Sequence, residues 1–333
     1  MKMRVVCPLL RWGILGLSLF LVLPISLSAN DLVYFTQVGN TDFAVFGTDG
    51  MRGLGTGSIA VAGVTGTVTG AYIFWHGPGA GNDDNANVTF NGTPVTGVNI
   101  GNSSDNCWGF TDSRAYRANV TALVTGDGTY TLANFTKPSG DEINGVSLLI
   151  FFNDGNPANN RDVVVFNGND SNQPNTYDAP GWNATLSGIN YASGTVNGFF
   201  IVSDGQVFTD DELRINGTVI LPAGQNWDGN TLPGGGDLWD QRSLDLTSLF
   251  VPGPNTLTIQ PAQATGSDCL SLIAVLFDLP LGAAGPTPTP PLGPTPTPGS
   301  GPTAPIPTLS TSMLALLGAA LLLIAILVIR RQA

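Results

Sequence analysis

The sequence is poor in the residues that carry acid–base and metal chemistry. Only 11% of the 333 residues are charged, and His76 is the single histidine. One histidine cannot supply the several nitrogen and sulfur ligands of a zinc centre. No Gly-x-Ser-x-Gly segment offers a nucleophile elbow, and no spacing singles out two carboxylates for glycoside hydrolysis. We therefore expect a protein that is not an enzyme, with an unrecognised glycosidase as the catalytic alternative.

Glutamate and basic residues are also scarce. Glu142 and Glu212 are the only glutamates among 24 acidic residues. Seven basic residues between positions 30 and 305 leave that region with a net charge of about −17, which disfavours binding to nucleic acid. Aspartate favours turns, and 43 glycines accompany it. This composition predicts an all-β protein with many turns.

Cysteine is limited to three residues, and Cys7 lies in a segment with the features of a secretory signal peptide. Residues 1–29 combine a basic start, an apolar run and small residues after Pro24. The alternative is an uncleaved membrane anchor. A membrane span needs an apolar run of about 20 residues, and the run here is shorter. An exported chain reaches an oxidising compartment, so Cys107 and Cys269 are a candidate disulfide; the alternative is two isolated thiols packed in cores.

The other end of the sequence has the features of a membrane anchor on a stalk. Residues 285–305 contain nine prolines, which predicts a semi-rigid polyproline spacer. Residues 309–329 carry no charge and would form a helix of about 31 Å at ~1.5 Å per residue, enough to cross a membrane. Arg330 and Arg331 follow, and because basic residues stay in the cytoplasm, the bulk of the chain is expected outside it.

The segment 306–333 carries a motif in front of this apolar stretch. Ile306, Pro307, Thr308 and Leu309 precede the helix, and the arginine pair follows it. This arrangement resembles the IPTL-CTERM sorting signal of Gram-negative bacteria, a relative of the PEP-CTERM signals. The resemblance implies export by the Sec machinery and recognition by an exosortase-type enzyme. It also implies anchoring in the membrane, or release to the cell surface or medium after processing.

Between its two ends the sequence repeats itself with a period of 124–127 residues. The corresponding landmarks are paired aspartates, an Asn-Gly turn, an Asn/Asp-x-Thr-x-Leu segment, an alternating strand and an almost wholly apolar strand. Asn-Gly favours a tight hairpin, and strict alternation favours a strand with one solvated face. The apolar segments Val146–Phe152 and Leu270–Phe277 are expected to be central strands, buried on both faces or beneath a partner sheet.

The second copy also resembles a known fold. The segments Leu213–Ile259, Leu244-Asp245-Leu246-Thr247 and Pro252–Leu257 resemble the jelly-roll sandwich of galactose-binding-like domains. The fold class expected is all-β, with two tandem antiparallel β-sandwiches at 31–157 and 158–281, a proline-rich linker and one C-terminal transmembrane helix.

Two kinds of candidate site follow. Asp83, Asp84, Asp210 and Asp211 recur at equivalent places and could supply oxygens to a structural Ca²⁺, although aspartates in turns are commonly only solvated. Loop tryptophans can stack on sugars, or can cover an edge of the core; the candidates are Trp108, Trp182, Trp227 and Trp239.

These features predict an exported cell-envelope protein with a non-catalytic, structural or adhesive role and no cofactor beyond that Ca²⁺. The alternative is a carbohydrate-binding module stabilised by calcium, with glycans as partners.

Overall fold

The described part of the chain consists of antiparallel β-strands. The computed structural model describes residues 32–177, 180–232, 238–261 and 268–282. Within these ranges helical structure is limited to three 3₁₀ turns, η1 (Asp84–Ala86), η2 (Thr121–Leu123) and η3 (Thr247–Leu249). The predicted all-β, antiparallel class is therefore confirmed.

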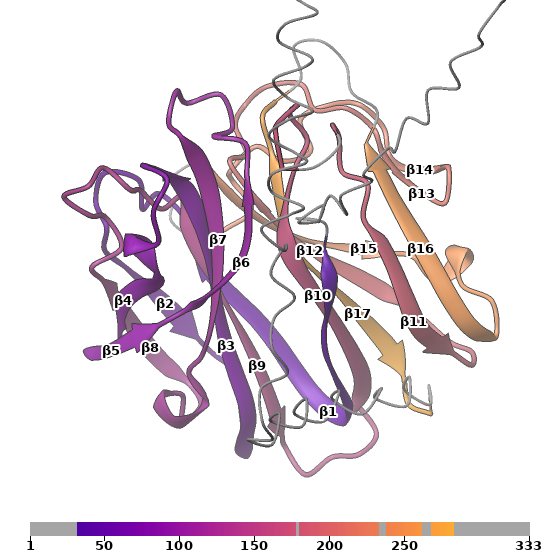
Figure 1. Cartoon of the computed structure of the whole chain (residues 1–333). Helices are drawn as coiled ribbons and strands as arrows, with labels where there is room; N and C mark the ends of the chain where they lie inside the picture. Colours follow the sequence, from indigo (N-terminus) through magenta and orange to yellow (C-terminus); the bar gives the residue numbers. More distant parts are fainter. Residues whose placement is uncertain (1–31, 178–179, 233–237, 262–267, 283–333) are drawn as a thin grey trace, which may run out of the picture. The chain divides into compact units, whose positions relative to one another are not determined.

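The strands form one nine-stranded sheet and two four-stranded sheets (Figure 1). Outward from its centre, the large sheet has the order β1-β9-β3-β7-β6 in one direction and β10-β17-β12-β15 in the other, and the small sheets have the orders β2-β8-β4-β5 and β11-β16-β13-β14. Corresponding strands therefore occupy corresponding places in the two copies. The first copy contains β1 (Val33–Thr48), β2 (Gly57–Val61), β3 (Thr67–Gly79), β4 (Asn87–Phe90), β5 (Thr93–Thr96), β6 (Val98–Ser103), β7 (Asp112–Asn119), β8 (Gly128–Ala133) and β9 (Gly145–Asn153). The second contains β10 (Arg161–Ser171), β11 (Thr185–Tyr191), β12 (Asn197–Ser203), β13 (Leu213–Ile215), β14 (Thr218–Leu221), β15 (Trp239–Asp245), β16 (Gly253–Pro261) and β17 (Ser271–Pro280).

Strand β1 joins the two copies. Its first part pairs with β10 of the second copy, from Val33 to Thr41. Its second part pairs with β9 of the first copy, from Asp42 to Thr48. The expected boundary at 157/158 falls in the connection between β9 and β10, yet the two copies share one continuous sheet.

Three hydrophobic cores hold these sheets together. One core lies within each copy, between its small sheet and its part of the large sheet. The third contains Phe74 and Leu149 from the first copy together with Val163, Ile201 and Trp239 from the second. Because Trp239 of β15 reaches Ser147 of β9, the two parts of the large sheet pack face to face. This explains why β9 and β17 are buried on both faces.

The turns of the two copies match in detail. Asn91 and Asn216 have left-handed φ values of 47° and 52°, and the glycine after each has a φ of 76°. The amide of each asparagine donates to a carbonyl of the neighbouring long strand, Thr131 or Thr258. These are the tight Asn-Gly hairpins that the sequence predicts.

Several predicted segments lie outside the described residues. They are the signal peptide at 1–29, the stalk at 285–305, the sorting motif, the transmembrane helix at 309–329 and the arginine pair at 330–331. Across the described ranges, no helix has the length and apolar character needed to cross a membrane.

Candidate functional site

The four candidate tryptophans have different surroundings. Trp182 and Trp227 are 2% exposed and meet edge to face, with ring centroids 6.0 Å apart. Trp239 is fully buried and donates from Nε1 to Ser147 Oγ at 3.0 Å. A sugar cannot reach an indole enclosed in a core, so the prediction of a stacking platform is wrong for these three. Trp108 is 39% exposed, and its ring remains available.

Trp108 lies beside a disulfide that links the two copies. Cys107, in the connection between β6 and β7, is bonded to Cys269, just before β17, and their Cα atoms are 6.2 Å apart. Asn106 and Cys107 both have left-handed φ values, 51° and 70°. The carboxylate of Asp105 stabilises this turn by accepting from the amides of Cys107 at 3.2 Å and Gly109 at 2.5 Å.

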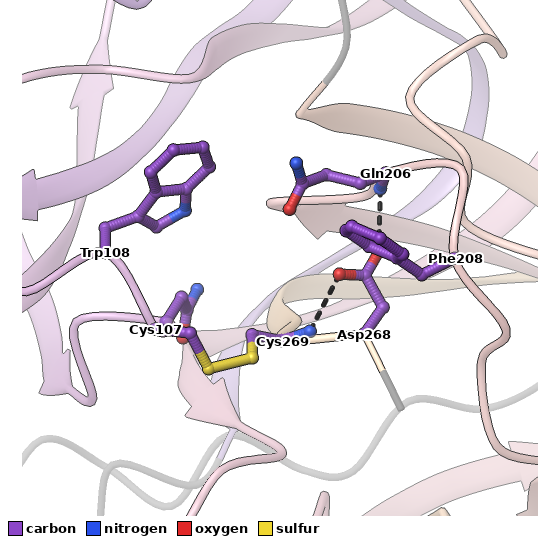
Figure 2. A pocket seen from close by; sticks show the side chains of 7 residues that line it. Cys107, Trp108, Gln206, Phe208, Asp268 and Cys269 are labelled. Atoms are coloured by element: carbon purple, nitrogen blue, oxygen red, sulfur yellow. Dashed lines mark hydrogen bonds between the residues drawn. A yellow bond between two sulfur atoms is a disulfide. The ribbon is translucent and has the colours of Figure 1, made fainter. Parts of the chain in front are cut away.

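A cleft of about 350 Å³ opens above this disulfide. Figure 2 shows Trp108 and Phe208 on opposite sides of it, with Gln206 between them and the disulfide at its base. The lining residues are Asn106, Cys107, Trp108, Gln206, Phe208, Asp268 and Cys269. Phe208 is 55% exposed. The two walls therefore come from different copies and present two aromatic rings with polar groups between them.

The first wall is held by a charged pair. The guanidinium of Arg52 lies over the Trp108 ring, 3.8 Å from its centroid. The Asp204 carboxylate accepts from Trp108 Nε1 at 2.9 and 2.8 Å and from Arg52 Nη2 at 3.2 Å. With its nitrogen bound and one face covered by a cation, the indole is fixed before any ligand arrives.

The second wall is the loop that follows β12. The Asp268 carboxylate accepts from the amides of Gln206 at 2.7 Å and Cys269 at 2.8 Å, as the dashed lines in Figure 2 mark. Burial raises the pKa of Asp268 to about 6, against the opposing effect of these hydrogen bonds. Burial likewise raises the pKa of Asp204 to about 7, although Arg52 and Trp108 favour its ionised form.

Sequence reasoning found Trp108 and the two cysteines of this cleft and missed its other members. Gln206 and Phe208 stand in the segment Gln-Val-Phe-Thr just before the aspartate pair 210–211. No local pattern sets them apart there. Arg52 and Asp204 are 152 residues apart in the chain, so only the tertiary structure brings them to one indole.

The carboxylates of Asp83 and Asp210, two of the predicted calcium ligands, have other partners in this structure. The Asp83 carboxylate accepts from Asn99 at 2.8 Å and pairs with Arg114 at 2.9 Å, so a guanidinium already occupies the place of a cation. Asp210 is buried and accepts from the amides of Asn226 and Trp227. Calcium requires six to eight oxygens around one ion. In the part of the chain that the structure describes, no three His, Cys, Asp or Glu residues are grouped to hold a metal. The calcium site therefore stays a prediction.

His76 has a structural environment. Its Nδ1 lies 2.7 Å from Ser203 Oγ, and the ring is fully buried. Burial lowers its pKa to about 3, so the ring is neutral at physiological pH. This contact lies near the end of β3.

Comparison with known proteins gives little. No family model and no curated protein matches the chain. A solved structure of a peptide-N(4)-(N-acetyl-β-D-glucosaminyl) asparagine amidase is similar at 12% identity, covering 72% of this chain and 96% of that one, with a TM-score of 0.22. A similarity of this size supports no conclusion about fold or activity.

Proposed function

We propose that this chain is an exported cell-envelope protein with a non-catalytic, adhesive role, and that it binds carbohydrate in the cleft between Trp108 and Phe208. The body would be two tandem jelly-roll sandwiches carried on a proline-rich stalk. Its export partners would be the Sec machinery and an exosortase-type enzyme acting at the 306–309 motif, with a membrane-anchored or released product.

The observation that carries the carbohydrate assignment is the fixed, half-exposed Trp108 ring facing Phe208 across the cleft. Aromatic faces stack on the apolar faces of sugars, while a few placed polar groups orient the ligand. Gln206, which lies between the two rings, supplies such a group here, whereas Asn106 and Asp268 are buried and use their side chains within the protein. A cleft of about 350 Å³ is at the small end of ligand pockets, which favours a terminal sugar or a short glycan.

One further observation supports export, and a second one bears on the partners. The disulfide between Cys107 and Cys269 is typical of oxidising compartments. The net charge of about −17 between residues 30 and 305 disfavours nucleic acid as a partner. The mass of the mature protein isolated from cells tests the export proposal, because it reports both cleavage points. A mass equal to that of the full 333-residue chain in the cytosol would contradict it.

A glycan array with the full chain, expressed with its own ends and purified from the envelope, tests the binding proposal. Trp108→Ala should weaken binding to any glycan that scores by about thirtyfold or more, since loss of a central aromatic anchor costs about 2 kcal/mol. Tyr34→Ala is the matched control, because Tyr34 is a 46% exposed aromatic of β1, outside the cleft. It should bind as the wild type does.

Equal binding by wild type and Trp108→Ala would remove the cleft from the proposal. Absence of binding across the array would leave a purely structural role. Hydrolysis of a scoring glycan, lost on Asp268→Asn, would instead support the glycosidase alternative.

A further inference from the structure

Asp204 occupies an unusual position at the start of the second wall. It directly follows β12, and its φ of 76° lies in the left-handed region, where residues with a side chain are strained. Its amide donates to the Leu238 carbonyl at 2.7 Å, and the residue is 1% exposed. The loop that begins here carries Gln206 and Phe208, so the backbone of Asp204 sets the direction of that wall.

Its side chain, in contrast, holds the first wall. The carboxylate binds Trp108 Nε1, Asn144 Nδ2 at 3.0 Å and Arg52 Nη2 at 3.2 Å. All three donors belong to the first copy. An ionised carboxylate can accept from several donors at once, and hydrogen bonds to it are roughly twice as strong as neutral ones. One residue therefore ties the two aromatic walls together.

We propose that Asp204 is the positioning residue of the cleft: ionised, it holds Trp108 at a fixed spacing from Phe208, and on taking up a proton it releases Trp108, so that pH switches the cleft between a rigid and a loose form. The ligand in this inference rests on the proposed function. The contacts of the Asp204 carboxylate with Trp108, Asn144 and Arg52, called the clasp below, do not depend on it.

The charges around Asp204 support a switch near neutrality. Arg52, between β1 and β2, favours the ionised carboxylate, and Asp268, ahead of β17, opposes it. Glu142 favours the charged form of Arg52, and His76 of β3 is neutral. Burial outweighs the favourable contacts and raises the pKa of Asp204 to about 7. Below that pH the carboxyl is neutral, and its own O–H has to share the space with the three donors from Trp108, Asn144 and Arg52. Arg52 also loses its counterion.

Tryptophan fluorescence can observe the clasp without a ligand. Among the described residues, Trp108 is the one exposed tryptophan; the other four are at most 2% exposed. Quenching by acrylamide should therefore report Trp108. We expect the quenching constant to be low above pH 8, to rise through a transition centred near pH 7, and to be high below pH 6. Trp108→Phe should abolish this transition. The same variant also controls for the fluorescence of Trp12, which is present if the signal peptide is not cleaved.

Asp204→Asn is the decisive variant, because asparagine is well tolerated at left-handed φ and removes only the charge. The acrylamide quenching constant of this variant should be high at every pH from 5 to 9. Arg52→Gln is the second variant and keeps the test usable if the first does not fold. Removing the cation should shift the transition to higher pH. Asp268→Asn should keep the transition and shift it slightly lower. A flat profile in the wild type, or an unchanged transition in Asp204→Asn, would overturn the proposal.

The binding measurement separates this inference from the proposed function. If a glycan binds, wild-type affinity should be about tenfold weaker at pH 5.5 than at pH 8, the size expected for one charge-assisted hydrogen bond, and Asp204→Asn should show no such change. A quenching transition without any glycan binding would retain the clasp and reject the ligand. Glycan binding that needs Trp108, together with a flat quenching profile, would retain the ligand and reject the clasp.

Discussion

Gly145 is a residue at which the two copies approach each other closely. It begins β9, and a Cβ built on it would lie 2.6 Å from Cγ of Trp239 and 2.7 Å from the carbonyl oxygen of Thr48. Real Cβ atoms do not approach other heavy atoms so closely. The absence of a side chain at this position lets the indole of Trp239 pack between the two parts of the large sheet.

Gly145→Ala should therefore destabilise the protein by about 1–3 kcal/mol, the usual cost of overpacking a core. Gly224→Ala is the matched control. A Cβ there has nothing closer than 4.0 Å, so the variant should be neutral or slightly stabilising. Urea denaturation of both variants checks this, and equal midpoints for the two would contradict it.

The tryptophans show what residue type alone can and cannot predict. All four candidates follow or precede Gly, Asn, Asp or Pro in the sequence, so their local contexts look alike. Trp182 and Trp227 are nevertheless buried together, and Trp239 lies in the core between the copies. Their burial depends on strands far away in the chain, which no local pattern reports.

At the level of elements, each copy contains one 3₁₀ turn built in the same way. In η2, Thr121 Oγ1 accepts from the amide of Ala71 at 2.9 Å; in η3, Thr247 Oγ1 accepts from that of Val196 at 2.9 Å. The side chain two residues earlier, Asn119 or Asp245, accepts from the threonine amide. The repeated Asn/Asp-x-Thr-x-Leu segment is therefore a clip that ties a turn to the neighbouring strand.

The residue between the acceptor and the threonine, rather than the leucine at the end, is the one fully enclosed. Val120 is 1% exposed and Leu246 0%, whereas Leu123 and Leu249 are only partly buried. In both copies it is therefore Val120 or Leu246, and not the final leucine, that fills the core next to the 3₁₀ turn.

Thr247→Ala should cost about 1–3 kcal/mol, because it leaves the buried amide of Val196 without its acceptor. Thr247→Ser keeps the hydroxyl and should restore most of that free energy of unfolding. Thermal denaturation of the two variants, with the Thr121 pair in parallel, measures the difference. Equal losses for alanine and serine would show that the methyl group, not the hydrogen bond, matters.

Over the whole molecule, ionisation is distributed unevenly between the two copies. Burial raises the pKa of four aspartates of the second copy: Asp204 and Asp210 to about 7, Asp240 and Asp268 to about 6. In the unfolded chain they titrate near 3.9. Between about pH 4 and 7 the folded protein therefore binds more protons than the unfolded one, and stability falls as pH rises. His76 acts in the opposite direction below about 6.5, because its pKa in the folded state is lowered to about 3.

Four carboxyls outweigh one imidazole, so the melting temperature should be higher at pH 5 than at pH 8. Asp210→Asn removes one of the four titrations and keeps an oxygen for the amides of Asn226 and Trp227, so it should make the dependence shallower. Calorimetry across this pH range tests both statements. A melting temperature that falls steadily from pH 8 to 5 would contradict the burial of these carboxyls.

The sequence by itself determined the strand-rich class, the repeat and its turns, because alternation, Asn-Gly pairs and the Asn/Asp-x-Thr-x-Leu clip act between residues close in the chain. Only the tertiary structure decided that β1 joins both copies in one sheet and that the parts of this sheet face each other across Trp239. It also decided the cleft, whose two walls are about 100 residues apart in the chain. Contacts over such separations depend on how whole sheets pack, and a local pattern carries no record of that packing.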